Sequence, residues 1–275
     1  MTGSLIIPES ITIIGSNAFE FGSGFTSLAF NDKTAKALTT LQINSNAFDG
    51  CSGLTSISFS NHIDFIGNDA FSGCPNLKGP HVIPDSVTQI GKNAFKNCQF
   101  ESLKLSNQLK SNGSSSFSYC SVLKGDLIIP DSVVEINQNA FENCYGLSSL
   151  KLGEKKAIIG PRAFYNCSNL SGSLNLPQSF SEIGKLSFGL TNFSDVVYRG
   201  ASAPICSSSF SQKENFIAHV SKSFNDTKFC GLETVADIPI ESASPSEIMT
   251  SNDETTASLI GETVTLTYLL LYIGH

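Results

Sequence analysis

Residues 131–152 read DSVVEINQNAFENCYGLSSLKL, and residues 85–105 read DSVTQIGKNAFKNCQFESLKL. The two stretches match almost residue for residue once a single deletion is allowed. A segment that recurs within one chain indicates a repeat architecture, in which each unit buries its apolar residues against its neighbours. The fold therefore has to be explained as a stack of similar units.

One phenylalanine marks each unit. Successive members are separated by 29, 23, 24, 22, 24, 23, 24 and 22 residues, which is the period of a solenoid. Five residues before the phenylalanine stands Ile in eight of the nine units, and Asn112 replaces it in the fifth. The nine members are Phe19, Phe48, Phe71, Phe95, Phe117, Phe141, Phe164, Phe188 and Phe210.

Four residues before the phenylalanine, glycine predominates and asparagine is its main substitute. Because these two residue types tolerate the left-handed backbone region best, we predict a positive φ at this position, where the coil turns a corner. The members are Gly15, Asn44, Gly67, Gly91, Gly113, Asn137, Gly160, Gly184 and Cys206.

Six consecutive units also carry a cysteine, most of them with a leucine after it, and then an alternating segment. The cysteine follows the phenylalanine by three residues, and the leucine follows three residues later, with Phe100 one place early in its shortened unit. Segments such as 54–59 and 147–152 predict strands that bury every second side chain. Strands stacked about 4.8 Å apart would form a continuous core. The cysteines are Cys51, Cys74, Cys98, Cys120, Cys144 and Cys167.

Two kinds of irregularity interrupt the period. The longer units have an extra residue beside Gly79, Gly125 or Gly172, which predicts a bulge or a wider bend. The interval between Phe19 and Phe48 includes an insertion at residues 32–38. We expect a solvated loop there, and a lip that contacts a ligand is the alternative.

The pattern I-G-x-x-A-F-x-x-C-x-x-L-x-x-L-x-L-P-x-S-V resembles the BspA-like leucine-rich repeats, found in surface antigens of oral bacteria and parasitic protists. The resemblance covers residues 4–235. It implies a β-rich leucine-rich repeat solenoid of about nine coils, with one or two parallel strands in each coil of 22–24 residues, little helix and a C-terminal cap. Residues 196–200, 203–204 and 229–231 resemble the cap of the family.

We divide the chain into a solenoid (residues 1–193), its cap (194–235) and an acidic Ser/Thr-rich tail (236–275) that ends in a short apolar segment. All 17 Lys and Arg residues lie at or before Lys228, so the repeat body is nearly neutral. It lacks the basic stripe that nucleic acid binding requires. The net charge of −7 comes from Glu233, Asp237, Glu241, Glu247, Asp253, Glu254 and Glu262.

The two ends carry no complete targeting segment. No signal peptide precedes the first strand-like residues, so we interpret the N-terminus as a truncated gene model or as an open edge that meets a partner. The apolar stretch 259–273 is interrupted by Glu262 and is shorter than the roughly 20 residues of a membrane span. We expect a strand-like tail there, with an incomplete anchor as the alternative. The family suggests a cell-surface or secreted protein, and a cytoplasmic location remains open.

Cysteine spacing argues against zinc. Zinc ligands come in pairs two to four residues apart, whereas the closest cysteines here are 22 apart. The six repeated cysteines are expected to pack as small buried apolar groups. Cys206 and Cys230 lie outside this series, 24 residues apart, and are the one pair that we consider for a disulfide.

The sequence predicts a protein that is not an enzyme. His62, His81, His219 and His275 fall at unrelated positions of the repeat, and no phosphate-binding Gly-Lys-Ser motif occurs. A Ser-His-Asp site assembled across coils is the alternative that stays open. No cofactor, metal or small-molecule substrate is expected. The resemblance implies adhesion to host cells or matrix proteins, and an intracellular protein-interaction scaffold is the alternative.

The outward residues of the strands are the candidate binding site. Between buried positions, the central row should run from Ile6 and Ala29 to Val197, and its middle forms the candidate partner-binding row. Apolar β-branched residues also favour strands for conformational reasons, which is the competing explanation. The insertion and the open N-terminal edge are the next candidates. The candidate row is Ser58, Val82, Lys104, Ile128, Lys151 and Asn175.

Overall fold

The computed structural model describes residues 3–31, 40–155, 158–210 and 216–238. By their contacts, residues 1–240 form one compact unit, and the division falls between residues 240 and 241. The predictions for the insertion at residues 32–38 and for the apolar end of the tail lie outside the described residues.

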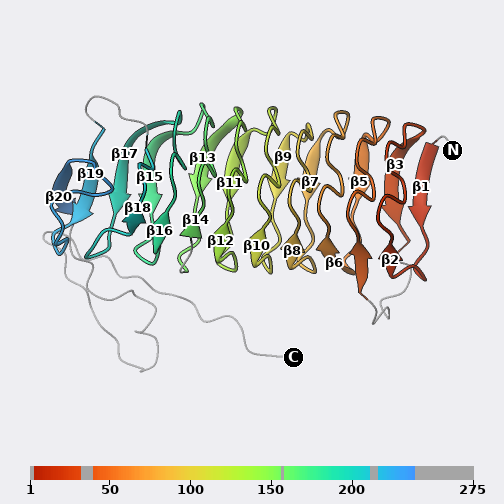
Figure 1. The fold of residues 1–275 in the computed structure, drawn as a ribbon, viewed down its shortest axis with the longest axis horizontal. Coiled ribbons are helices and arrows are strands. Elements are labelled where there is room, and N and C mark those ends of the chain that lie inside the picture. Colours follow the sequence, from red (N-terminus) through yellow and green to blue (C-terminus); the bar gives the residue numbers. More distant parts are fainter. Residues whose placement is uncertain (1–2, 32–39, 156–157, 211–215, 239–275) are drawn as a thin grey trace, which may run out of the picture. The chain divides into compact units, whose positions relative to one another are not determined.

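The described residues form a parallel β-solenoid without helices, in which coils stack in chain order (Figure 1). One side carries the longer strands, which we call the strand face. Its strands pair in the groups β1-β3-β5, β7-β9, β11-β13 and β15-β17-β19-β20. They are β1 (Gly3–Ile7), β3 (Phe25–Phe30), β5 (Ser56–Ser58), β7 (Pro80–Val82), β9 (Ser102–Lys104), β11 (Gly125–Ile128), β13 (Leu147–Lys151), β15 (Ser171–Leu176), β17 (Asn192–Tyr198), β19 (Ala218–Ser221) and β20 (Thr234–Ile238).

The other side is one continuous sheet of nine short strands, of which eight end at the repeated Ile position. In β18 Cys206 pairs with Ile183, and Ile205 is exposed, so the core position predicted for Ile205 is wrong. Two strands in each coil confirm the predicted leucine-rich repeat solenoid. The strands of this sheet are β2 (Ile13–Ile14), β4 (Leu41–Ile43), β6 (Ile63–Ile66), β8 (Gln89–Ile90), β10 (Ser111–Asn112), β12 (Glu135–Ile136), β14 (Ile158–Ile159), β16 (Glu182–Ile183) and β18 (Ile205–Cys206).

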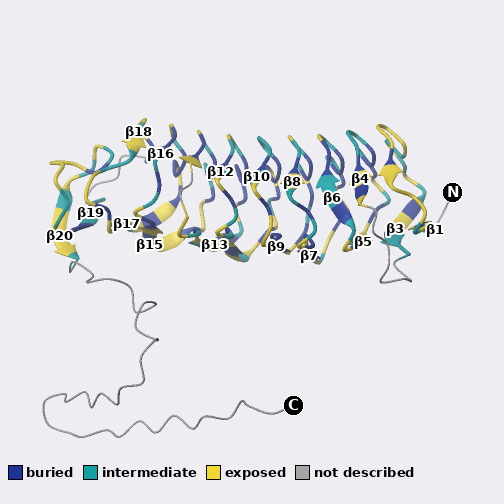
Figure 2. Cartoon of the chain, turned by 90° about the horizontal axis from the view of Figure 1, so that it is seen from below, coloured by how far each residue is buried: buried dark blue, intermediate teal, exposed yellow. Residues whose placement is uncertain are grey.

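Buried segments recur from coil to coil (Figure 2). They contain ladders of similar residues, which form the core between the two sides. The nine repeated phenylalanine rings stack nearly parallel, with neighbouring centroids 5.1 to 5.6 Å apart. Each repeated cysteine is buried, and its thiol donates a hydrogen bond to the phenylalanine carbonyl of the preceding coil, as Cys144 does to Phe117 at 3.2 Å. The cysteines therefore join neighbouring coils while filling the core.

The conformational role that we predicted for the repeated glycine is wrong. The left-handed residues lie two positions before and two positions after the phenylalanine, as at Asn139 and Asn143, and not four before it. Close approach between coils favours glycine at most of these positions: a Cβ at Gly113 would lie 2.3 Å from the backbone carbon of Gly91. At Gly184 it would lie 2.5 Å from the nitrogen of Pro161.

Of the three longer coils, in which a bulge or a wider bend was predicted, two have a bulge, whereas the pairing of β7 with β9 shows no shift of register. Gly79, Gly125 and Gly172 have φ angles of 81°, 79° and 77°, which glycine adopts without strain. The pairing of β11 with β13 shifts register directly after Gly125, and that of β15 with β17 shifts directly after Gly172. Each bulge thus accommodates the extra residue at the start of a strand.

The C-terminal part continues the stacking. Strand β17 pairs with β15 on one side and with β19 on the other, and β20 follows β19. Strand β20 ends at Ile238, three residues beyond the end that we predicted for the cap. The division between solenoid and cap at residues 193 and 194 stays a prediction.

Candidate partner-binding surface

Strand pairing aligns the candidate row across the strand face. Val82 pairs with Lys104, Ile128 pairs with Lys151, and Asn175 pairs with Val197. Towards the N-terminus, Ser58 pairs with Ala29, which in turn pairs with Ile6. All six side chains of the candidate row are exposed.

Alternation along each strand turns these side chains outward. His81, Leu103, Leu127 and Leu174 precede row members directly, and all four are buried. Because successive side chains of a strand point to opposite faces, the row members must face solvent. The chain therefore presents one row of side chains at a spacing of about 4.8 Å per coil.

The composition of the row is unusual for a surface in water. Val82 and Ile128 are 56% and 57% exposed, although nothing in the core requires them to be apolar. Lys104 and Lys151 lie beside them in register, and no member of the row is acidic. A mixture of apolar and long cationic side chains can contact a protein surface by both burial and charge.

A second outward row, which the sequence analysis missed, lies two residues earlier in each strand. Short hydroxyl side chains dominate it, and they leave the apolar members of the first row accessible. Ser27 donates a hydrogen bond to Ser4 at 2.7 Å, and Ser149 donates one to Asp126 at 2.6 Å. The repeated serine was visible in the sequence. The row is Ser4, Ser27, Ser56, Pro80, Ser102, Asp126, Ser149, Ser173 and Asp195.

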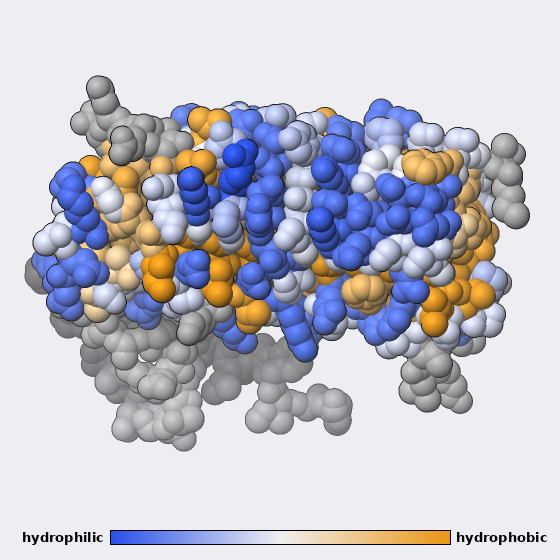
Figure 3. All heavy atoms as spheres, viewed as in Figure 1, coloured by the Kyte–Doolittle hydropathy of each residue, from blue (hydrophilic) through white to orange (hydrophobic). Residues whose placement is uncertain are grey.

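The N-terminal end of the stack carries a separate apolar surface, visible at the end where β1 lies in Figure 3. Ile6, Ile13 and Phe21 are 60%, 57% and 70% exposed there. The ring of Phe19 stacks on Phe48 on one side only among the described residues. This end remains the next candidate after the strand face.

The sequence model of the family described as "BspA type Leucine rich repeat region (6 copies)" matches residues 2–124, 41–171 and 88–217. These matches cover most of the chain. The chain belongs to the BspA-type leucine-rich repeat family. Leucine-rich repeat proteins act as protein-interaction modules through their extended repeat surfaces, and this general role applies to the chain.

Solved structures are similar to this BspA-type chain in fold. A leucine-rich repeat protein from Bacteroides ovatus has a TM-score of 0.52 at 20% identity, covering 80% of this chain and 70% of its own. The T. pallidum leucine rich repeat protein has a TM-score of 0.42 at 22% identity, covering 61% and 83%. A leucine rich cell surface protein from Faecalibacterium prausnitzii has a TM-score of 0.41 at 20% identity, covering 87% and 79%. No curated protein matches the chain.

The histidines of this BspA-type chain form no catalytic group in the part that the structure describes. His81 is buried against Phe100, with ring centroids 4.9 Å apart, and burial lowers its pKa. His219 contacts Asp237 through Nδ1 at 2.7 Å, and no serine hydroxyl is bonded to its other ring nitrogen. Among the described residues, no group of three His, Cys, Asp or Glu could hold a metal ion, and no helix is long and apolar enough to cross a membrane.

The repeated cysteines are poor nucleophiles. Burial raises the pKa of Cys144 and of Cys167 well above the ordinary thiol value. A thiol that is neutral and already donates to a backbone carbonyl is chemically inert. These cysteines belong to the framework of the BspA-type repeat.

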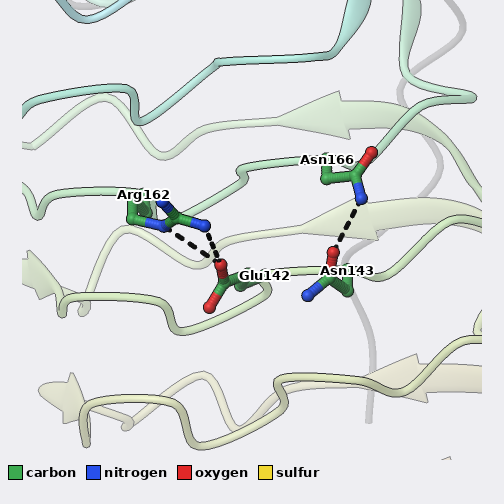
Figure 4. A network of polar contacts seen from close by, with 4 residues as sticks. All are labelled: Glu142, Asn143, Arg162 and Asn166. Carbon is green, nitrogen blue, oxygen red and sulfur yellow. Dashed lines mark hydrogen bonds and ion pairs between the residues drawn. The ribbon is translucent and has the colours of Figure 1, made fainter.

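A polar network at the turns joins two coils (Figure 4). Arg162 donates to Oε1 of the buried Glu142 from Nε at 3.0 Å and from Nη2 at 2.6 Å, and its guanidinium carbon lies 3.9 Å from the ring centroid of Tyr165. This hydrogen bonding raises the pKa of Arg162. Asn166 donates to Asn143 at 2.8 Å. The network stabilises the stack, and sequence reasoning missed it because its members are 20 or more residues apart.

Cys206 and Cys230 are paired in the structure, with their Cα atoms 5.2 Å apart. This separation suits a disulfide and would tie β18 to the turn before β20. Whether the protein carries this bond stays a prediction, which needs a chemical test.

Proposed function

We propose that the chain is a non-catalytic module that binds a protein partner through the strand face. The observation that carries the proposal is the exposure of Val82 and Ile128, each in register with a lysine, on the strand face. From Val82 to Lys151 the row spans three strand spacings, or about 15 Å. This length, extended by the serine row, suits the centre of a protein contact.

The nine-stranded sheet is less suited to this role. Its outward row includes the exposed Ile13, Ile158 and Ile205, but no lysine lies in register between them. The middle of the row consists of Gln89, Ser111 and Glu135, which are polar and neutral or acidic. Its strands are also mostly two residues long, so each strand contributes few outward side chains to that side. Polar side chains of this kind are typical of a hydrated surface.

We further propose that the chain is located at the cell surface or is secreted, and that it adheres to a host cell or a matrix protein. This part rests on the resemblance of the repeat to the surface antigens of the family. Sequons at Asn169, Asn192 and Asn225, whose asparagines are exposed, are compatible with a secreted protein.

A paired substitution tests the face. Val82→Glu with Ile128→Glu should abolish attachment to the cells or matrix protein that the unaltered chain binds, because two charges replace the apolar centre of the contact. The matched control is Gln89→Glu with Ser111→Glu, which adds the same charges to the opposite sheet. Unchanged attachment by a folded Val82/Ile128 variant would reject the strand face as the binding site.

An intracellular interaction scaffold is the second candidate. Six unpaired cysteines support it, because free thiols persist in reducing compartments. Localisation of a tagged full-length chain, combined with protease treatment of intact cells, separates the two candidates. Cleavage at the cell surface supports adhesion, whereas a protected intracellular chain supports the scaffold.

A further inference from the structure

One coil is shorter than its neighbours at a single place. In the flanking coils a buried leucine follows the cysteine by three residues, as Leu77 follows Cys74. In the shortened coil Phe100 follows Cys98 by only two residues and is still buried, with 1% exposure. The residue that corresponds to Asn76 and Val122 in the adjacent coils is therefore missing from the turn between them.

A groove of about 570 Å³ lies at the position of the missing residue. Asn76 and Val122 lie on either side of it, two strand spacings or about 9.6 Å apart along the stack. Gln99 of the shortened coil lies between them, and Pro75, Lys78, Glu101 and Lys124 complete the lining. The groove arises from the loss of one residue and extends over two strand spacings along the stack. It is therefore wide enough to receive a side chain of another molecule.

The lining offers more hydrogen-bond donors than acceptors. Glu101 is paired with Lys124 at 3.2 Å, whereas Lys78 has no ion pair among the described residues. Gln99 accepts a hydrogen bond from Ser121 at 3.2 Å through Oε1, so its amide nitrogen remains available as a donor. Two lysines against one carboxylate leave a positive charge at the groove, which favours an anionic occupant.

The groove is also continuous with the strand face. Lys78, Glu101 and Lys124 precede the first residues of β7, β9 and β11 by one or two positions. Most of the lining residues are exposed, so that a small molecule in the groove would bury less of its surface than in an enclosed ligand pocket. A side chain that projects from a large partner on the strand face suits such an open site better.

We infer that this groove receives a glutamate or aspartate side chain of the protein partner, with Lys78 and Lys124 contacting the carboxylate. The inference rests on the proposed function, because the partner has to cover the strand face for its side chain to reach the groove. It adds a requirement for an acidic residue at a fixed distance from the apolar contacts at Val82 and Ile128.

The test is a nuclear magnetic resonance titration of the full-length chain with N-acetyl-glutamate N-methylamide. We expect saturable shifts of the Gln99 and Asn76 side-chain amides, with an affinity about tenfold weaker for the glutamine analogue, as for the loss of a charge-assisted hydrogen bond. Lys78→Gln should weaken binding similarly. Lys92→Gln, an exposed lysine outside the groove, should leave it unchanged.

Two further variants make the outcome decisive. Insertion of one alanine between Gln99 and Phe100 restores the residue that the turn lacks and should fill the groove while keeping both lysines. Val82→Glu with Ile128→Glu should retain glutamate binding, so that a failed strand-face proposal and a failed groove remain distinguishable. Equal shifts with the glutamate and glutamine analogues, or shifts that survive Lys78→Gln, would overturn the inference.

Discussion

Replacement of Asn112 by Ile is expected to stabilise the protein. Asn112 is 1% exposed and occupies the position that Ile90 and Ile136 hold in the adjacent coils. Its Nδ2 is buried without a hydrogen-bond partner among the described residues. The site is therefore a buried polar group within an apolar ladder whose neighbours on both sides are already isoleucine.

Asn112 also disturbs the backbone pairing between coils. At the adjacent steps, the N–H after the Ile position donates to a backbone carbonyl, as Gly160 donates to Ile136 at 2.7 Å. Here the backbone N–H of Asn137 instead donates to Oδ1 of Asn112 at 3.4 Å. The side-chain Nδ2 of Asn137 donates to the backbone carbonyl of Asn112 at 2.8 Å. A side chain that competes with the backbone in this way weakens the sheet.

The magnitude follows from three contributions. Removal of the unsatisfied amide gains about 1–3 kcal/mol. Burial of an aliphatic side chain in its place adds about 1 kcal/mol or more. Loss of the long hydrogen bond from Asn137 to Oδ1, with some crowding by the branched side chain, costs about 1–2 kcal/mol. We expect a net gain of about 1–2 kcal/mol for Asn112→Ile.

Urea denaturation and hydrogen exchange measure this gain. Amides 107–120 should exchange faster than those of residues 131–150 in the unaltered chain, and Asn112→Ile should slow them. A matched pair tests the same reasoning: Ser116→Ala removes an unpaired buried hydroxyl, whereas Ser187→Ala removes one that donates to Gly184 at 2.6 Å. The first should be neutral or stabilising and the second destabilising. A loss of stability in Asn112→Ile would refute the account of this coil.

Three other predictions concern stability. Phe141→Ala should cost about 3–5 kcal/mol in urea denaturation, because it opens a cavity within the ring stack, and a cost below about 1 kcal/mol would contradict this. Burial lowers the pKa of His81, so the unfolded chain binds the proton at a higher pH than the folded chain does. The free energy of unfolding should therefore fall as the pH drops below the ordinary pKa value of 6.5. His81→Leu should remove that part of the pH dependence. Cys206→Ser should lower the melting temperature only if the cap disulfide forms, and thiol alkylation under non-reducing conditions should leave Cys206 and Cys230 unlabelled.

The repeat made most of the fold predictable. Each ladder position occurs up to nine times, so Phe, Ile and Cys could be assigned to the core without knowledge of the coil geometry. The glycine row shows where this reasoning fails, because a positive φ and a close backbone approach select the same residue type. The structure identifies the close approach as the cause, because a Cβ at Gly113 would clash with the backbone of the preceding coil.

The candidate surface was predictable in part. Alternation along the strands was enough to place Val82 and Ile128 outward, since the pattern has a period of two. The groove at the shortened coil was not predictable, because a deletion becomes a groove only when Asn76 and Val122 are held on either side by stacking. The pairing of Glu142 with Arg162 depends on the same inter-coil register.

Site-directed photo-crosslinking tests the strand face most directly. A benzoyl-phenylalanine at Lys104 or at Ser102 should form adducts with a protein of the cells or matrix to which the chain attaches, because both positions lie outward on β9. The same group at Gln89 or Ser111, on the opposite sheet, should form none. Adducts from Gln89 and Ser111, with none from Lys104 and Ser102, would contradict the proposal that the chain binds its partner through the strand face.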